Sequence, residues 1–170
     1  MSVLTVYFSR KGENYFGGSI RSIAKGNTEV IAEYIQEAVG GDLFEIRTKQ
    51  SYPSDYRECT DVAMDEKRAN ARPELVETLP SLDAYDTIFV GYPNWWGTCP
   101  MAVFSFLDQF DLNGKTLVPF CTNEGSGMGT SESDLRKNYP DAQIRKGLSI
   151  SGSAVSSASN KTAAWAKENI

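Results

Sequence analysis

The chain has 170 residues, of which 41% are hydrophobic and 23% charged, and this composition predicts one compact domain over residues 1–170. Its formal net charge of −5 argues against a nucleic-acid-binding protein, which needs a basic face to neutralise phosphates. No apolar run approaches the roughly 18 residues that span a bilayer, and the sequence starts almost directly with a strand, so neither a membrane segment nor a signal peptide is expected.

The first predicted strand and the first predicted helix lie on either side of polar residues that an intervening segment divides into two groups. Val3–Phe8 is apolar on nearly every residue, which is typical of a parallel strand covered on both faces. Lys11–Ala24 is polar and has no convincing period, so an inserted loop is expected there. Residues 27–39 carry an apolar stripe at helical spacing, and Gly40-Gly41 ends this helix.

The remaining elements alternate between strand and helix. Further strands are expected at 42–47, 86–92, 115–121 and within 144–150. Further helices are expected within 56–71 and at 100–110, 131–139 (with Ser131 as its N-cap) and 159–168. The alternation predicts an α/β three-layer sandwich, in which a parallel sheet has helices on both faces. In such sheets ligands bind beyond the carboxyl ends of the strands, where three unusual loops should meet.

The first of these loops combines Ser9 and Arg10 with Gly26, Asn27 and Thr28 at the start of a helix. The first N–H groups of a helix have no internal acceptors and carry partial positive charge, so the loop is a candidate phosphate site. Asn27 or Thr28 could instead merely cap the helix, and Arg10 could point outward.

The second loop is Pro93-Asn94-Trp95-Trp96-Gly97. Two successive side chains in a strand-end loop rarely both point inward, so one tryptophan is expected in the core and the other at the surface. An exposed indole suits stacking on a flat ring, and Pro93 and Gly97 suit a tight loop that brings backbone close to that ring.

The third loop runs from Thr122 through Asn123, Glu124 and Gly125 to Gly127. Its glycine spacing does not match a dinucleotide signature, and a flexible turn is the simplest interpretation. Opposite the tryptophan loop, it could close the other side of a bound ring and offer N–H groups to the ring's carbonyl edge.

Acidic residues are concentrated in one stretch of the chain. Residues 54–86 hold nine of the 22 acidic and four of the 17 basic residues, so the rest of the chain has 13 of each. A solvated surface is the simpler interpretation. The alternative is a docking face for a basic redox partner, because opposed electrostatic fields raise association rates.

Cysteine and histidine usage limits the possible chemistry. Cys59, Cys99 and Cys121 are scattered, which indicates a reducing, cytoplasmic location, and Cys99 is expected to be a packing residue, with a redox-sensitive thiol as the alternative. The chain has no histidine, which removes Ser-His-Asp and Cys-His catalysis and every His-ligated metal site. Three scattered cysteines make a poor zinc site, so no metal is expected.

Together, Ser9-Arg10, Gly26-Asn27-Thr28, the stretch GYPNWWGTCPM from Gly91 to Met101, and TNEGSG from Thr122 resemble a bacterial flavodoxin, within the subgroup of flavodoxin-like proteins that have a Trp-Trp-Gly loop. The resemblance implies noncovalently bound FMN and a five-stranded parallel sheet of order 2-1-3-4-5. It implies that the first loop holds the phosphate, the second flanks the isoalloxazine ring, and the third forms the remaining wall. The residues so implied are Ser9, Arg10, Gly26, Asn27, Thr28, Pro93, Asn94, Trp95, Trp96, Gly97, Thr122, Asn123, Glu124, Gly125 and Gly127.

The expected function is that of a monomeric, low-potential electron carrier whose reductase and acceptor proteins dock near the flavin edge. An NAD(P)H-dependent flavin or quinone reductase on the same fold is the alternative.

Two departures from the family pattern bear on the site. The stretch Lys11–Ala24 interrupts the phosphate loop, and Asn123 stands where many relatives carry histidine.

Overall fold

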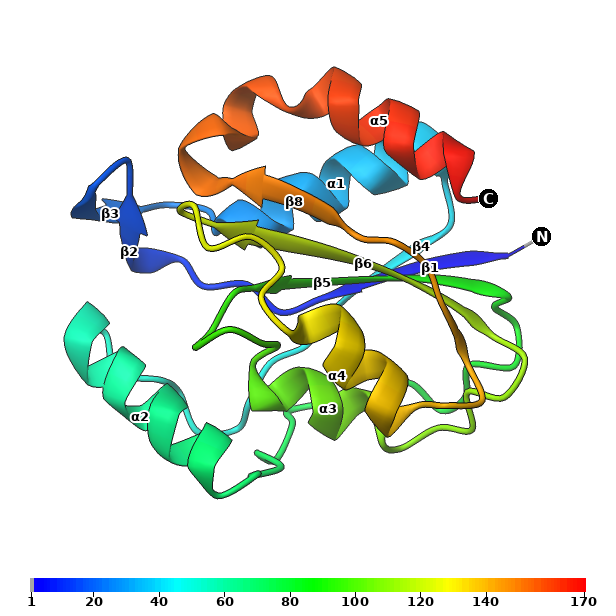
Figure 1. Cartoon of the computed structure of the whole chain (residues 1–170), viewed down its shortest axis with the longest axis horizontal. Helices are drawn as coiled ribbons and strands as arrows, with labels where there is room; N and C mark the ends of the chain where they lie inside the picture. Colours follow the sequence, from blue (N-terminus) through cyan, green and yellow to red (C-terminus); the bar gives the residue numbers. More distant parts are fainter. Residues whose placement is uncertain (1) are drawn as a thin grey trace.

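A parallel sheet forms the middle layer of the computed structural model, which describes residues 2–170 (Figure 1). β4, β1, β5 and β6 are neighbours in that order, and β7 and β8 both pair with β6 along its far edge. The predicted order 2-1-3-4-5 is therefore confirmed, with two short strands sharing the fifth position. The strands are β1 Val3–Tyr7, β4 Asp42–Glu45, β5 Thr87–Pro93, β6 Thr116–Asn123, β7 Gln143–Ile144 and β8 Leu148–Ser151.

Helices cover both faces of this sheet (Figure 1). α1 (Asn27–Val39) and α5 (Ser159–Glu168) lie on one face, preceded in the case of α5 by the 3-10 helix η1 (Gly152–Ser157). α3 (Met101–Leu107) and α4 (Ser131–Asn138) lie on the other face. Within residues 2–170, no helix has both the length and the apolar character needed to cross a bilayer.

Alternate residues of the central strands supply two hydrophobic cores, one on each face of the sheet. In β1, Leu4 and Val6 belong to the core that contains the residues of α3, while Val3 and Tyr7 belong to the core beneath α1. Every residue of β1 is buried, as its apolar sequence predicted. Burial on both faces fixes the register of these strands, because a shift by one residue would exchange the two faces.

The segment 11–24 is not the loop that its polar sequence led us to expect. It forms an antiparallel hairpin of β2 (Gly12–Phe16) and β3 (Ser19–Ile23), joined by Gly17 and Gly18. Both glycines have positive φ values, 62° and 91°, as a two-residue hairpin turn requires. The expectation was wrong because a two-stranded hairpin at the surface buries little and so shows no clear apolar alternation.

One smaller expectation also needs correction. Ser131 is not the N-cap of α4 but its first residue; its hydroxyl donates to the Met128 carbonyl (2.6 Å) and accepts from the Tyr92 hydroxyl (2.9 Å). Ser131 therefore joins α4 to β5 instead of capping the helix. The strand expected within residues 144–150 is present as β8, and the short β7 precedes it.

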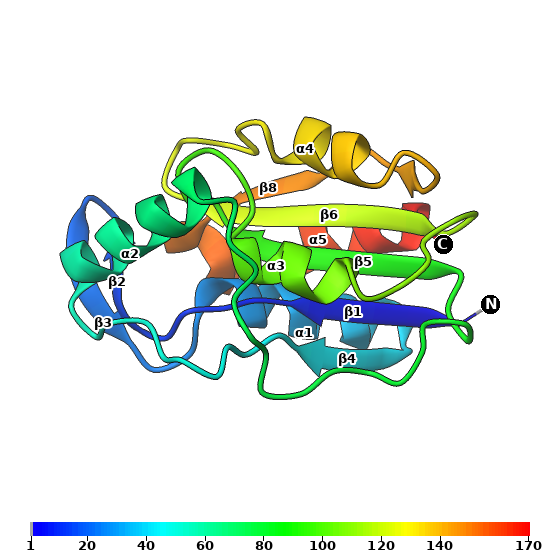
Figure 2. The same ribbon diagram turned by 90° about the horizontal axis from the view of Figure 1, so that it is seen from below.

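α2 (Tyr56–Arg68) does not cover either face of the sheet. Figure 2 shows it beyond the carboxyl ends of the strands, near the β2–β3 hairpin. Asp55 caps its first turn by accepting a hydrogen bond from the Glu58 N–H. The hairpin and α2 thus extend the molecule at the edge where the three loops converge.

The contact between β5 and β6 leaves no space beside Gly91. A Cβ atom at this position would overlap the Phe120 ring, which belongs to the paired residue in β6. Gly91→Ala is expected to lower the free energy of unfolding by about 1–3 kcal/mol through overpacking, as measured by urea denaturation. In a Phe120→Ala background the same change should cost little, and an equal cost in both backgrounds would contradict this explanation.

Candidate functional site

A cavity of about 370 Å³ opens at the carboxyl edge of the sheet, between the three loops, the hairpin and α2. Its size lies within the range of small-molecule and cofactor sites. Most residues expected from the sequence line it: Arg10, Asn27, Thr28, Pro93, Asn94, Trp95, Trp96, Gly97, Thr122, Asn123 and Glu124. Ser9, Gly26, Gly125 and Gly127 are not among the lining residues, and their contacts show what they do instead.

Ser9 and Gly26 support the N-terminus of α1. The Ser9 hydroxyl accepts a hydrogen bond from the Glu29 N–H (3.2 Å), and a Cβ at Gly26 would collide with it, so glycine lets the two segments meet. Gly26 is the N-cap residue and no side chain caps the helix from that position. Thr28, which is buried, shares a 2.8 Å hydrogen bond with the hydroxyl of Thr122, which ties α1 to the end of β6. The helix N-terminus is thereby fixed at the cavity.

The tryptophan loop is a two-residue turn closed by two hydrogen bonds. The Trp95 N–H donates to the Thr98 carbonyl (3.0 Å), and the Thr98 N–H donates to the Trp95 carbonyl (3.3 Å). Trp96 and Gly97 have φ values of 56° and 86°, the combination required by a type I′ turn. Trp96 therefore has a left-handed backbone conformation, which residues with bulky side chains seldom adopt. Backbone strain of this kind is concentrated at functional sites.

The two tryptophans have different environments, as the sequence predicted. Trp95 is half-buried and meets Phe8 and Tyr52 edge-on, at ring-centre distances of 5.1 and 4.9 Å. Trp96 is 45% exposed and lines the cavity. Its indole N–H donates to the Thr60 carbonyl of α2 (2.8 Å), so the exposed ring is held in place.

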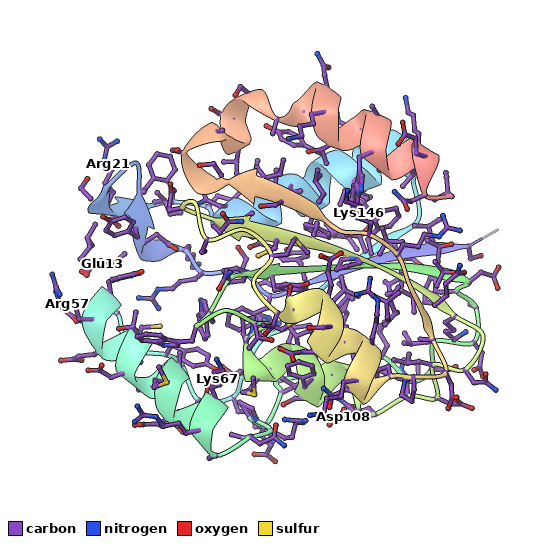
Figure 3. All side chains as sticks on the ribbon, viewed as in Figure 1. Glu13, Arg21, Arg57, Lys67, Asp108 and Lys146 are labelled. Carbon is purple, nitrogen blue, oxygen red and sulfur yellow. The ribbon has the colours of Figure 1, made fainter. Side chains whose placement is uncertain are left out.

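Hydrogen bonds on both sides also fix the orientation of the peptide that joins Trp96 to Gly97. The Trp96 carbonyl accepts from the Lys67 ammonium group of α2 (2.6 Å), and the Gly97 N–H donates to Asn94 Oδ1 (2.8 Å). Figure 3 labels Lys67 on α2. The Asn94 amide also donates to the Gly127 carbonyl (2.9 Å), so this side chain joins the second loop to the third.

The third loop is organised around Asn123. Its Oδ1 accepts from the N–H groups of Gly125 (3.1 Å) and Gly127 (3.0 Å), and its amide donates to Ser149 (2.8 Å). These two N–H groups are therefore used within the loop and are not free for a ligand, contrary to the role considered for them. The residues of this loop that line the cavity are Thr122, Asn123, Glu124 and Ser126.

Arg10 and the hairpin connect the first loop to α2. The Arg10 guanidinium donates to the carbonyls of Glu13 (2.9 Å) and Ser54 (3.1 Å), the latter just before α2. Glu13, labelled in Figure 3, accepts from the Tyr56 N–H (3.0 Å) with its side chain. These contacts hold the hairpin against the start of α2, and both elements line the cavity.

The structure adds lining residues that the sequence analysis missed: Asn14, Tyr15, Tyr56, Cys59, Thr60, Ala63, Ser126 and Gly152. Four of them share one face of α2, at positions 56, 59, 60 and 63. That spacing of i, i+3, i+4 and i+7 was visible in the sequence, but nothing in it indicated that this face would meet a cavity and not the sheet. The Gly17-Gly18 turn was the available signal for the hairpin.

The residues present fit the group that the flavodoxin resemblance implies, FMN. A helix N-terminus at which the N-cap residue Gly26 supplies no side chain suits its phosphate, and an exposed indole suits its ring. Glu124 Oε1 is buried with no hydrogen-bond partner among residues 2–170, as expected for an atom that a ligand satisfies.

Comparison with known proteins identifies the family. The flavodoxin family model matches residues 18–169. This chain belongs to the flavodoxin family. A search of curated proteins returned no match.

Solved structures agree with the flavodoxin assignment. A candidate flavoprotein from Bacteroides uniformis is 30% identical, with a TM-score of 0.75, over 98% of this chain and 97% of that one. A second candidate flavoprotein, from Bacteroides eggerthii, is 32% identical, with a TM-score of 0.70, over 95% of this chain and 98% of that one. A Lactobacillus acidophilus flavoprotein in complex with FMN is 21% identical, with a TM-score of 0.67, over 92% and 97% of the two chains, and shares the fold.

The cysteines of this flavodoxin are buried and unpaired. Burial raises the pKa of Cys99 well above its ordinary value and raises that of Cys59, which lines the cavity. Burial likewise raises the pKa of Cys121 to about 12, although a hydrogen bond with Asn123 opposes the shift. At neutral pH these groups are therefore thiols, which agrees with a packing role for Cys99.

The raised pKa of Cys121 predicts a loss of stability in alkali. Below pH 9 the thiol is protonated in both the folded and the unfolded protein, and its contribution to the free energy of unfolding is fully present. Between about pH 9 and 12 the unfolded thiol ionises first, so the free energy of unfolding should fall, by at most about 1.4 kcal/mol per pH unit from this group. Urea denaturation at several pH values measures the slope. Cys121→Ala should make it shallower, and an unchanged slope would contradict the assignment.

Proposed function

We propose that this protein binds FMN and acts as a low-potential electron carrier between redox partner proteins. The observation that carries the proposal is that one cavity is lined both by the first residues of a helix whose N-cap is a glycine and by an exposed, immobilised indole. FMN combines a phosphate with a flat aromatic ring, so it matches both features. The family assignment and the FMN complex of the Lactobacillus acidophilus protein support the same cofactor.

The N-terminus of α1 is the proposed phosphate site. The Ser9 hydroxyl is occupied by the Glu29 N–H, and the Thr28 hydroxyl is paired with Thr122. The groups left to bind an anion are the backbone N–H groups of Asn27 and Thr28 and the side-chain amide of Asn27, with the helix dipole adding partial positive charge. Arg10 lines the same cavity but bridges the hairpin to Ser54, so we assign it to holding the walls together.

Trp96 is the proposed platform for the ring. The type I′ turn and the hydrogen bond to Thr60 fix the indole before any ligand arrives. A preorganised surface binds a flat ring with less loss of conformational entropy than a mobile one. Trp95, the preceding residue of the same turn, is itself held by its contacts with Phe8 and Tyr52.

When bound, FMN would supply one- and two-electron transfer, and the protein would set its access and its potential. The chain carries a net charge of −5 and no histidine. Like charges a few ångströms apart cost about 1–4 kcal/mol at effective dielectric constants of 80–20, so added electrons on the ring are disfavoured. This electrostatic environment suits a carrier of low potential.

The experiment that tests this function is an FMN titration of the apoprotein followed by a redox titration of the complex. FMN fluorescence should be quenched on binding, and the second reduction step should lie below that of free FMN. Failure to bind FMN would overturn the proposal, and a second step above the free-flavin value would contradict its electrostatic part. Rapid mixing with NADPH should leave the flavin oxidised, whereas fast bleaching would show a reductase instead.

The mouth of the cavity is the proposed docking surface for a basic redox partner. Tyr15 and Trp96, which line the cavity, are exposed large hydrophobic side chains, and α2 carries a third, Val62. The outer face of α2 adds the exposed carboxylates of Asp61 and Asp65, one turn apart. Apolar contacts bordered by acidic groups suit a transient complex with a cationic protein.

Neutralising these carboxylates should slow electron transfer to a cationic acceptor. Asp61→Asn/Asp65→Asn is expected to reduce the rate of cytochrome c reduction severalfold at low salt, and the difference should vanish near 0.5 M salt, where charges are screened. Glu37→Gln/Asp141→Asn removes two exposed charges away from the cavity and serves as the control. Equal rates for the two double variants at low salt would contradict this docking surface.

A further inference from the structure

We infer that Lys67 positions the Trp96 platform for the flavin ring, because it ties the peptide between Trp96 and Gly97 to α2. The inference rests on the proposed binding of FMN and adds to that site a residue that does not itself line the cavity. Lys67 is therefore a positioning residue, which acts on the ring through Trp96.

The backbone of Trp96 depends on its surroundings. Its φ of 56° lies in the left-handed region, which is unfavourable for a residue with a bulky side chain. Conformations of this kind persist only where the contacts around them determine them. The contacts that matter most are those on the two sides of the following peptide, which carries the Trp96 carbonyl and the Gly97 N–H.

Lys67 supplies the contact on the side of α2. Its ammonium group donates to the Trp96 carbonyl at 2.6 Å, while the indole N–H of the same tryptophan donates to the Thr60 carbonyl at 2.8 Å. Thr60 and Lys67 are seven residues apart, which is about two helical turns, so they share one face of α2. This face holds both the backbone and the side chain of Trp96 (Figure 3 labels Lys67).

The neighbouring loops hold the Gly97 end of the turn. The Gly97 N–H donates to Asn94 Oδ1 (2.8 Å), and the Gly97 carbonyl accepts from the Thr130 N–H (2.6 Å). A Cβ at Gly129 would overlap the Gly97 carbonyl, so glycine lets the third loop approach this closely. These contacts fix Gly97 and leave the Trp96 carbonyl to Lys67.

The charge of Lys67 has no other assigned use in the described part of the chain. It takes part in none of the ion pairs formed by residues 2–170. A lysine in the last turn of a helix also interacts favourably with the helix dipole. Arg68 shares this turn and this charge, but within residues 2–170 only Lys67 of the two is bonded to the tryptophan loop. Arg68 is therefore a matched control for the dipole contribution.

Loss of this hydrogen bond would let the platform move. The peptide and the indole attached to it would sample more orientations, and a ligand would have to order them at a cost in affinity. The cost applies to every ligand that stacks on the indole, whatever side chain the ligand carries. The ring alone should therefore report the effect.

The inference is tested by the affinity of Lys67→Met for lumiflavin, which has the ring alone, and for FMN. Fluorescence quenching should show both flavins binding about fivefold more weakly than to the unchanged protein. Lys67→Arg keeps a charged donor at this position and should restore most of the affinity. Arg68→Met removes a charge from the same turn and should leave both affinities unchanged.

A double-mutant cycle with Trp96→Ala separates positioning from a direct effect of Lys67. Without the indole there is no platform to hold, so Lys67→Met should leave the FMN affinity of the Trp96→Ala protein unchanged. An equal loss of affinity in both backgrounds would show that Lys67 acts on the flavin or on the fold of α2, and it would overturn the inference.

The apoprotein gives a readout that needs no ligand. The order parameter of the Trp96 indole N–H, measured by ¹⁵N relaxation, should fall in Lys67→Met and stay unchanged in Arg68→Met. The melting temperatures of the two variants should be similar, because Lys67 is exposed and an exposed charged contact contributes little to stability. A purely structural role would instead lower the melting temperature of Lys67→Met and leave the order parameter unchanged.

Two further results have distinct meanings. If FMN bound more weakly to Lys67→Met but lumiflavin did not, Lys67 would act through its charge on the phosphate, and the inference would be wrong. If the unchanged protein bound neither flavin, the proposed function itself would fail. The order parameter of Trp96 in the apoprotein would still show whether Lys67 holds the indole, so the two failures are distinguishable.

Discussion

The site depends on three parallel strands, β1, β5 and β6, that are buried on both faces and end at the same edge of the sheet. Burial on two faces fixes their register, because any slip would move apolar residues between the two cores. The segments that follow these strands therefore meet at one edge. Two further links, Ser9 with the Glu29 N–H and Thr28 with Thr122, then hold the N-terminus of α1 there.

The outer walls of the cavity come from elements that contribute little to the main cores. The β2–β3 hairpin is largely exposed, and two-stranded sheets are marginally stable on their own. It is held by Arg10, which reaches Ser54, and by Glu13, which accepts from the Tyr56 N–H. α2 is held in turn by the tryptophan turn through Thr60 and Lys67. Regions with few buried contacts open most readily, so the walls are the parts of this site best suited to move when a ligand enters.

The sequence was sufficient to predict features that depend on a local residue pattern or on the burial of one continuous apolar segment. The parallel sheet followed from the alternation of elements, and its strand order followed from the family resemblance. The different environments of Trp95 and Trp96 followed from their adjacency in a strand-end loop. It did not predict the hairpin, because Gly17-Gly18 was the only clear signal in a segment that buries little. The role of Gly152 was also missed, since the side chains that pack closely against it belong to Asn27 and Glu124, which are distant in the chain.

The central claim is that the N-terminus of α1 holds the phosphate of a flavin nucleotide. The most direct measurement is a comparison of amide chemical shifts in the ¹⁵N-labelled protein saturated with FMN and saturated with riboflavin, which differ only in the phosphate. We predict that the largest differences occur at Gly26, Asn27 and Thr28, because the Glu29 N–H is already bound by the Ser9 hydroxyl. Differences concentrated elsewhere, with these three amides unchanged, would contradict the account.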